Sequence, residues 1–292
     1  MVATHGLQSA APTIESDAFV TRDGLRLPLR RWDADHPKAI IVALHGMSDY
    51  SRSFDLPGSW WAEHGITTLA YDQRGFGAAP DPGVWAGADA MRQDLADFAD
   101  AARAKYPGLP VYALGESMGG AVVLSALAGS YPLHISGVIL VAPAVWSRDD
   151  MPASYRAALW LGAHVVPAMH FSGGGLRIVA CDNIAVLRQL SRDPLFQHSA
   201  RADQIYGLAN LMDEARLAPQ HLVNPPPILF LYGANDQVIP AEPTEAVIAE
   251  LGARAEVHRD DNGYHMLLRD LDGETQWSEV ADWVAKRQIA PQ

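Results

Sequence analysis

The sequence predicts an α/β fold in which helices flank a mostly parallel central sheet. Two observations support this prediction. Short apolar runs alternate along the chain with longer segments of helical periodicity, an alternation typical of parallel sheets covered by helices on both faces. In addition, the motif Gly115-Glu116-Ser117-Met118-Gly119 stands between a predicted strand and a predicted helix. A chain that changes from strand to helix over so few residues must turn sharply there.

The N-terminal elements are a hairpin followed by two buried strands. Residues 17–32 are predicted to form the hairpin. Residues 39–44 are continuously apolar, as expected of a strand covered on both faces, and they end at His45-Gly46. Residues 66–71 form the next predicted strand, which ends at Asp72-Gln73-Arg74-Gly75.

The rest of the alternation follows from periodicity and run length. A helix is predicted over residues 89–105, because Met91, Leu95, Phe98 and Ala102 recur at helical spacing and form one apolar face. The remaining predicted elements are strands at 110–114, 137–141, 226–232 and 255–258, and helices at 119–128, 243–251 and 276–287.

Residues 145–225 interrupt this alternation, because no strong strand pattern appears in them. A loop of that length would be exceptional, so the interval should carry its own structure. Helix-like stretches at 184–190 and 202–211 predict an inserted helical cap over the site. The predicted organisation is a core formed by residues 1–144 and 226–292, with the cap at 145–225. Apolar cap residues are expected both to line the site and to anchor the cap.

Composition limits the classes of partner. Hydrophobic residues make up 49% of the chain, which is enough for a substantial core. The net charge of −12 without a basic cluster argues against nucleic acid and against long-range attraction to anionic membranes. Contact of the cap with lipid through a local patch stays open. The lone Cys181 excludes an intramolecular disulfide and is expected to be a small buried residue.

Targeting and cofactor signals are lacking in the sequence. Residues 1–12 have neither the basic start nor the apolar core of a signal peptide. No run approaches the roughly 18 apolar residues that span a bilayer. The chain is therefore expected to be soluble and cytoplasmic. No metal-ligand spacing or phosphate-binding loop is found, so no metal or cofactor is predicted. Nothing in the sequence indicates an oligomeric state.

The motif around Ser117 matches Gly-x-Ser-x-Gly, the nucleophile elbow. Its strand–turn–helix setting makes the match much more specific than the five residues alone. Gly115 and Gly119 lack the Cβ atoms that would clash at such a turn. The motif therefore predicts a nucleophilic serine.

These features together resemble the α/β-hydrolase superfamily. They are the elbow, His45-Gly46, Asp72-x-Arg74-Gly75-x-Gly77 and the position of the cap. Within the superfamily, residues 115–120 look like the Gly-His-Ser-Met-Gly-Gly of monoacylglycerol lipase and lysophospholipase-like serine hydrolases. Residues 106–111 and 191–195 also resemble that branch. The likeness covers roughly residues 38–285 and implies an α/β-hydrolase fold.

Two departures from this branch lie close to Ser117. Glu116 replaces the usual histidine before the nucleophile. Met47-Ser48-Asp49-Tyr50 replaces the usual small residue and acidic-His pair after His-Gly. Both bear on the identity of the substrate, and both leave the class of reaction unchanged.

A serine hydroxyl needs a base and an orienting carboxylate to act as a nucleophile. In this fold the chain order is serine, carboxylate, histidine, with the carboxylate just past a strand. Asp236 follows the strand at 226–232 and is the predicted acid. Asp149 and Asp150, after the strand at 137–141, are the alternatives.

His265 is the predicted base, because it follows the last strand and comes after the acid in the chain. His258 lies inside that strand and is expected to belong to the sheet packing. His45 is a second candidate base, but the resemblance implies that it holds the oxyanion loop. Arg74 is expected to fix its own loop, with binding of an anionic substrate as the alternative.

The oxyanion hole requires two backbone N–H groups directed at the developing charge. The residue after the nucleophile, Met118, supplies one, and the loop after His45-Gly46 supplies the other, predicted to be that of Met47.

The resemblance implies hydrolysis of a small-molecule ester with a single acyl chain, of the monoacylglycerol or lysophospholipid type. The apolar cap fits this substrate, because an acyl chain needs a dry pocket. The alternatives are a small-ester carboxylesterase, an amidase or peptidase of the same fold, an acyltransferase, and a non-catalytic ligand-binding module on the same fold.

Overall fold

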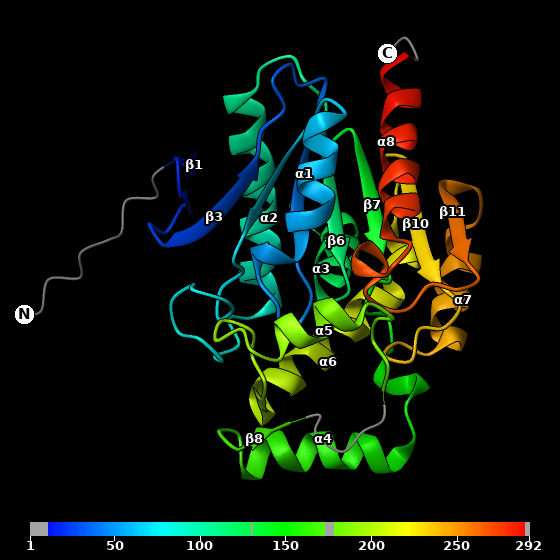
Figure 1. Cartoon of the computed structure of the whole chain (residues 1–292). Coiled ribbons are helices and arrows are strands. Elements are labelled where there is room, and N and C mark those ends of the chain that lie inside the picture. Colours follow the sequence, from blue (N-terminus) through cyan, green and yellow to red (C-terminus); the bar gives the residue numbers. More distant parts are fainter. Residues whose placement is uncertain (1–10, 130, 173–177, 290–292) are drawn as a thin grey trace, which may run out of the picture.

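The computed structural model describes residues 11–129, 131–172 and 178–289 (Figure 1). The sequence predicts that residues 1–12 are not a signal peptide. Most of these residues, 1–10, lie outside the described ranges. Among the described residues, one sheet of nine strands has the order β1-β2-β3-β5-β4-β6-β7-β10-β11. In that order the strands are β1 (Thr13–Ile14), β2 (Ala18–Val20), β3 (Arg26–Trp32), β5 (Ile66–Tyr71), β4 (Ala39–Leu44), β6 (Val111–Glu116), β7 (Gly137–Val141), β10 (Ile228–Gly233) and β11 (Ala255–Asp260).

Six neighbouring strands of the sheet, β5, β4, β6, β7, β10 and β11, are parallel to one another. The N-terminal strands β1, β2 and β3 form an antiparallel extension, which joins the sheet where β3 pairs with β5. The predicted mostly parallel sheet is therefore confirmed, as is the predicted hairpin. Parallel strands all end at the same edge, so the residues that follow β4, β6, β7, β10 and β11 gather there.

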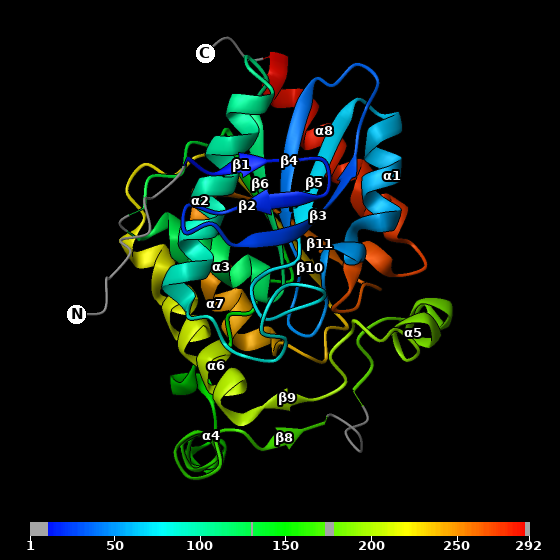
Figure 2. The ribbon, with the colours of Figure 1, turned by 90° about the vertical axis from the view of Figure 1, so that its left-hand side faces the viewer.

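Helices cover both faces of the sheet (Figure 2). The helices on one face are α1 (Asp55–Glu63) and α8 (Gly273–Ile289), and those on the other are α2 (Ala88–Lys105), α3 (Met118–Leu127) and α7 (Ala241–Leu251). Side chains alternate between the faces along a strand. Accordingly, Ile40 and Val42 of β4 belong to the core under α2 and α3, whereas Ile41 packs in the core with Trp61 and Trp283.

Helix α1 was not predicted, because its sequence contains Pro57-Gly58, a pair that usually marks a turn. Pro57 is tolerated because it lies in the first helical turn, where its missing N–H has no partner within the helix. Gly58 packs on Trp32, and a Cβ at this position would lie 2.5 Å from the indole ring. The requirement for glycine comes from a strand distant in sequence, so a local pattern does not reveal it.

Between β7 and β10 the chain is mainly helical, as predicted. It contains α4 (Ala153–Val165), α5 (Ile184–Leu190) and α6 (Ala202–Leu217), with a two-residue antiparallel pair formed by β8 (His170–Phe171) and β9 (Ala200–Arg201). Helix α6 packs on α3, and α4 packs on α6. Figure 1 shows α4 and β8 at the end of the molecule beyond the carboxyl ends of β7 and β10.

The sequence predicted α5 and α6 but gave no boundaries for α4. No residue of α4 is buried, and its apolar side chains lie both toward the cavity, as Leu159 does, and on the exposed surface, as Trp160 and Val165 do, so the sequence does not show one apolar face opposite a polar one. The division into residues 1–144, 145–225 and 226–292 stays a prediction. Among the described residues, no helix combines the length and apolar character needed to cross a membrane.

Candidate active site

Ser117 lies at the turn between β6 and α3, with the backbone angles φ 53° and ψ −115°. Left-handed angles are unfavourable for a residue with a Cβ, so the surroundings must hold them. The Ser117 N–H donates to the Val141 carbonyl (3.0 Å), and the Ser117 carbonyl accepts from Ala144 N–H (2.9 Å). A Cβ on Gly119 would lie 2.1 Å from the Leu44 carbonyl oxygen, so only glycine fits there. The strand–turn–helix geometry of a nucleophile elbow is therefore present.

The structure brings Ser117, His265 and Asp236 together in a continuous hydrogen-bonded chain. Ser117 Oγ lies 2.9 Å from His265 Nε2, and His265 Nδ1 lies 2.7 Å from Asp236 Oδ2. The Asp236 side chain is fully enclosed, and that of His265 is 8% exposed. Because Asp236 accepts the Nδ1 proton, Nε2 is left free to accept the proton of the Ser117 hydroxyl.

The Asp236 carboxylate is held by its own loop. Its second oxygen, Oδ1, accepts hydrogen bonds from the N–H groups of Val238 (2.7 Å) and Ile239 (3.0 Å). The loop also lies tightly against the one that carries His265, since a Cβ on Gly233 would lie 2.4 Å from the Gly263 carbonyl oxygen. Two loops from neighbouring strands β10 and β11 thus fix the acid relative to the base.

The alternative residues lie in other environments. Asp149 is exposed, and Asp150 accepts a hydrogen bond from Ser147 Oγ (2.8 Å) and lies 3.7 Å from the Arg216 guanidinium. His258 is a half-buried residue of β11 and lies 3.8 Å from Glu279. Of the candidates, only Asp236 and His265 are brought to Ser117.

The two predicted oxyanion donors flank Ser117. Met118 is the first residue of α3, and its N–H is one of those left without a partner inside the helix. Met47 follows Gly46, whose Cβ, if present, would lie 3.2 Å from that of Ser117. Neither N–H has a hydrogen-bond acceptor in the described part of the chain. Both are available to a substrate oxyanion, and their role stays a prediction.

His45 holds the loop after β4 through hydrogen bonds at both of its ring nitrogens. Its Nδ1 donates to the Gly46 carbonyl (2.8 Å), and its Nε2 accepts from the N–H of Gln73 (2.9 Å). The Gln73 side chain in turn donates to the His45 carbonyl (2.8 Å). Burial lowers the pKa of His45, which favours the neutral ring that these partners require. No ring nitrogen remains to act as a base.

Arg74 is likewise occupied. Its guanidinium forms two hydrogen bonds with Asp94 of α2 (2.6 and 2.8 Å) and two with Asp23 in the hairpin turn (both 2.8 Å). Bidentate pairs of this kind fix orientation as well as distance. The arginine therefore joins the hairpin to α2 and is not free to bind an anionic substrate.

Sequence analysis missed Arg269 (in the short 3₁₀ helix η5, Leu267–Arg269), which is buried and contacts both departures from the family pattern. It donates to Asp49 Oδ2 (2.6 Å) and to Glu116 Oε2 (3.2 Å). From the sequence, Glu116 and the stretch of residues 47–50 that contains Asp49 are recognisable only as departures from the family pattern. A buried acidic residue directly before the nucleophile needs a cationic partner. This requirement is the one feature of the sequence that could have indicated a buried arginine such as Arg269.

Cys181 is buried, as predicted, and burial raises the pKa of its thiol to about 12. Its sulfur lies near the carboxylates of Asp182 and Asp270. A cysteine and two aspartates placed in this way could hold a metal ion. However, the Asp270 carboxylate accepts the N–H of Tyr264 (2.7 Å), and that of Asp182 accepts the N–H of Leu271 (2.8 Å). These contacts attach the segment around Cys181 to the loop of His265.

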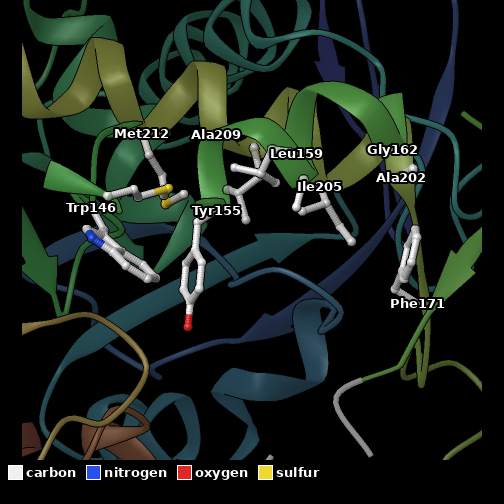
Figure 3. Close-up of a pocket in the computed structure, with 12 residues that line it drawn as sticks. Trp146, Tyr155, Leu159, Gly162, Phe171, Ala202, Ile205, Ala209 and Met212 are labelled. Carbon is white, nitrogen blue, oxygen red and sulfur yellow. The ribbon is translucent and has the colours of Figure 1, made fainter. Parts of the chain in front are cut away.

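An apolar cavity of about 370 Å³ lies between α4 and α6 (Figure 3). Residues that line it include Trp146, Tyr155, Leu159, Phe171, Ile205 and Met212. In Figure 3, Trp146 and Phe171 lie at opposite sides of the view. Trp146 comes two residues after Ala144, whose N–H is bonded to the Ser117 carbonyl. The segment from Ala144 to Trp146 therefore connects one end of the cavity to the nucleophile, although neither Ser117 nor His265 lines the cavity itself.

The order serine, aspartate, histidine on a parallel sheet with an elbow defines the class of α/β-hydrolase fold proteins with a Ser-His-Asp arrangement. Within this class, the family model described as "Serine aminopeptidase, S33" matches residues 35–272. The chain belongs to this family.

Similar proteins cover nearly the whole chain. A "Monoglyceride lipase" of Rattus norvegicus is 25% identical over 92% of this chain and 90% of its own. A "Monoacylglycerol lipase" of Mycolicibacterium smegmatis is 23% identical over 93% of this chain and 97% of its own. The solved structure of a soluble variant of monoglyceride lipase from Saccharomyces cerevisiae superposes with a TM-score of 0.80 at 19% identity, over 98% of this chain and 99% of that one. This likeness confirms the predicted α/β-hydrolase fold.

Proposed function

We propose that this protein is a serine hydrolase that cleaves carboxylic esters of single acyl chains, of the monoacylglycerol or lysophospholipid type. The observation that carries the proposal is the relay from Asp236 through His265 to Ser117, with separations of 2.7 and 2.9 Å. Such a relay on a strained elbow serves to activate a hydroxyl.

The reaction proceeds through an acyl-enzyme. Ser117 Oγ attacks the ester carbonyl while His265 Nε2 takes the hydroxyl proton, and Asp236 stabilises the resulting imidazolium. The N–H groups of Met47 and Met118 bind the oxyanion of the tetrahedral intermediate. His265 then protonates the leaving alcohol, and a water molecule that it activates releases the acid from Ser117. The chemistry needs no cofactor.

The apolar cavity between α4 and α6 supports an acyl-chain substrate. Its volume of about 370 Å³ is in the range of sites for small organic ligands, and apolar walls favour a hydrocarbon chain. The rat and mycobacterial relatives are named as lipases of monoacylglycerols.

Hydrolysis of p-nitrophenyl esters of increasing acyl length, with a monoacylglycerol as the second substrate, tests the proposal. We expect turnover to rise with acyl length and the monoacylglycerol to be cleaved. Turnover of only the shortest esters would favour the carboxylesterase alternative. No turnover of any ester by folded protein would contradict the proposal and favour a binding module. Added alcohol acceptors show whether acyl transfer competes with hydrolysis.

Filling the cavity provides a sharper test. Leu159→Trp is expected to lower kcat/KM for the long-chain ester about 10-fold or more, because pocket contacts with methylene groups discriminate to that extent. Turnover of the shortest ester should be unchanged. Leu161→Trp is the matched control, since Leu161 lies on the same helix with 53% of its surface exposed. Equal effects of the two variants would show that the cavity does not hold the acyl chain.

The proposal includes contact of the cap with a lipid surface. Large apolar side chains are exposed there, including Trp160 (53%), Val165 (66%) and Phe171 (45%). Residues 153–171 contain no acidic residue, although the whole chain has a net charge of −12. We expect the protein to sediment with neutral phosphatidylcholine vesicles and Trp160→Asp/Val165→Asp to sediment less. Equal sedimentation of both proteins would exclude this contact surface.

The cap at residues 145–225 over a core of 1–144 and 226–292 belongs to the same proposal, supported by the position of α4 beyond the strand ends (Figure 1). A cytoplasmic location is also proposed. The single buried thiol of Cys181 fits a reducing compartment, where disulfides are rare.

A further inference from the structure

We propose that Arg269 is a positioning residue that locks the nucleophile elbow, the oxyanion loop and the His265 loop to one another. This inference rests on the proposed function, because it concerns the same Ser117 site. It assigns a role to Glu116, which replaces the usual histidine of the family, and to Asp49, which lies within the stretch of residues 47–50 that forms the second departure.

The guanidinium of Arg269 reaches two carboxylates, one at the end of β6 and one in the loop after β4. Nη1 donates to Asp49 Oδ2 at 2.6 Å, and Nη2 donates to Glu116 Oε2 at 3.2 Å. All three residues are buried, with exposures of 6% for Arg269, 3% for Asp49 and 2% for Glu116. The cluster is therefore largely shielded from solvent, and Asp49 and Arg269 border a small pocket on one side.

Each member of the cluster is next to a part of the predicted machinery. Glu116 is the last residue of β6 and directly precedes Ser117. Asp49 follows Met47 by two residues, and its N–H closes a turn onto the Gly46 carbonyl (3.3 Å). Arg269 follows His265 by four residues in the same loop. One guanidinium thus connects the nucleophile, the oxyanion donor and the base.

The oxyanion loop needs such an anchor. Ser48 in this turn has a φ of 70°, which is unfavourable for a serine. Besides the contact with Arg269, Asp49 accepts a hydrogen bond from the N–H of Tyr50 (2.9 Å) through its other oxygen. The Arg269 contact therefore acts on this turn together with the hydrogen bond from the Gln197 N–H to the Ser48 carbonyl (2.8 Å). The Met47 N–H belongs to the same turn.

The cluster is not explained by stability alone. Two carboxylates share one guanidinium, and burial raises the pKa of the Glu116 carboxyl. Glu116 Oε1 and Arg269 Nε have no hydrogen-bond partner among the described residues. A buried ion cluster with unsatisfied atoms is often no more stable than an apolar replacement, so a positioning role is the better explanation. Arg269 also offsets negative charge near the place where the oxyanion forms.

The test compares Arg269→Gln, Arg269→Lys and the double variant Glu116→Gln/Arg269→Gln, with Arg216→Gln as the matched control. Arg216 also bridges two acidic residues, Asp150 and Glu250, and its side chain is 16% exposed. Three quantities are measured for each protein: the thermal midpoint, kcat and KM on a p-nitrophenyl ester, and the rate at which a fluorophosphonate probe labels Ser117. The probe reports activation of the serine without assuming an ester substrate.

Arg269→Gln is expected to lower kcat and the labelling rate about 100-fold with a small change in KM, because small misplacements of catalytic groups have effects of that size. Arg269→Lys should recover part of the loss, because lysine keeps the charge but not the bidentate fork. The double variant should be more active than Arg269→Gln, since it removes an unpaired buried carboxylate. Arg216→Gln should lose stability without losing kcat.

Several results would overturn the proposal. Folded Arg269→Gln with kcat and labelling within about two-fold of the native chain, or equal loss of kcat in Arg216→Gln, would show a purely structural role. If Arg269→Gln does not fold, the same comparison is made with Arg269→Lys, and full activity of that variant would refute the requirement for a fork. A native chain that labels with the probe but cleaves no ester would refute the proposed substrate alone, and labelling would still decide the role of Arg269. A native chain that does not label would refute both.

Discussion

Substituting Ser117 with alanine is expected to lower kcat on p-nitrophenyl esters by about a million-fold, to the level of the remaining binding and oxyanion contacts. The relay of 2.9 and 2.7 Å separations acts through the Ser117 hydroxyl, so once it is removed the oxygen that attacks the ester is lost and His265, oriented by Asp236, has no serine proton to accept. Burst and steady-state kinetics with the ester measure the loss.

Ser125→Ala is the matched control for this variant. Ser125 is a buried serine of the adjacent helix α3, and within the described part of the chain its hydroxyl donates only to the Val122 carbonyl (3.1 Å). We expect its kcat to equal that of the native chain. Mass spectrometry after fluorophosphonate treatment should find the adduct on Ser117. Turnover that survives in Ser117→Ala, or an adduct on another residue, would contradict the proposed nucleophile.

Asp236→Asn is expected to lower kcat about 10⁴-fold while leaving the fold intact, an effect known for the orienting carboxylate of Ser-His-Asp sites. The asparagine carbonyl can keep the hydrogen bonds from Val238 and Ile239, so the loop stays in place. Its amide group then faces His265 Nδ1 as a donor, which favours the tautomer with the proton on Nε2. That tautomer cannot accept the Ser117 proton.

The alternative acids provide the control for this prediction. Asp149→Asn changes an exposed residue, and we expect its kcat to match the native value. Steady-state kinetics and thermal melting of both variants separate an effect on chemistry from an effect on folding. A loss of activity in Asp149→Asn that exceeds the loss in Asp236→Asn would move the acid to the end of β7.

Much of this site follows from local sequence patterns. Buried parallel strands are continuous apolar runs, so residues 39–44, 66–71 and 137–141 coincide with β4, β5 and β7. The carboxyl ends of parallel strands share one edge, and chain order then selects Asp236 and His265 from the available acidic residues and histidines. The structure places both beside Ser117, and their catalytic roles stay a proposal.

Features that depend on contacts between distant segments were not predicted. Helix α1 contains Pro57-Gly58, whose glycine is required by Trp32 of another element. Helix α4 has no buried residue, and apolar side chains lie on its exposed surface as well as toward the cavity. Arg269 has no motif of its own, because its role depends on where Asp49 and Glu116 lie in space.

The sequence by itself determined the α/β fold, the elbow and the identity of the three residues in the relay, because strand burial, glycine at a tight turn and chain order are local or ordinal properties. The tertiary structure alone decided which charged groups meet beneath the site and where an apolar cavity opens between α4 and α6. Pairing of buried charges and the volume between helices depend on distances between residues far apart in the chain, and a linear pattern does not encode them.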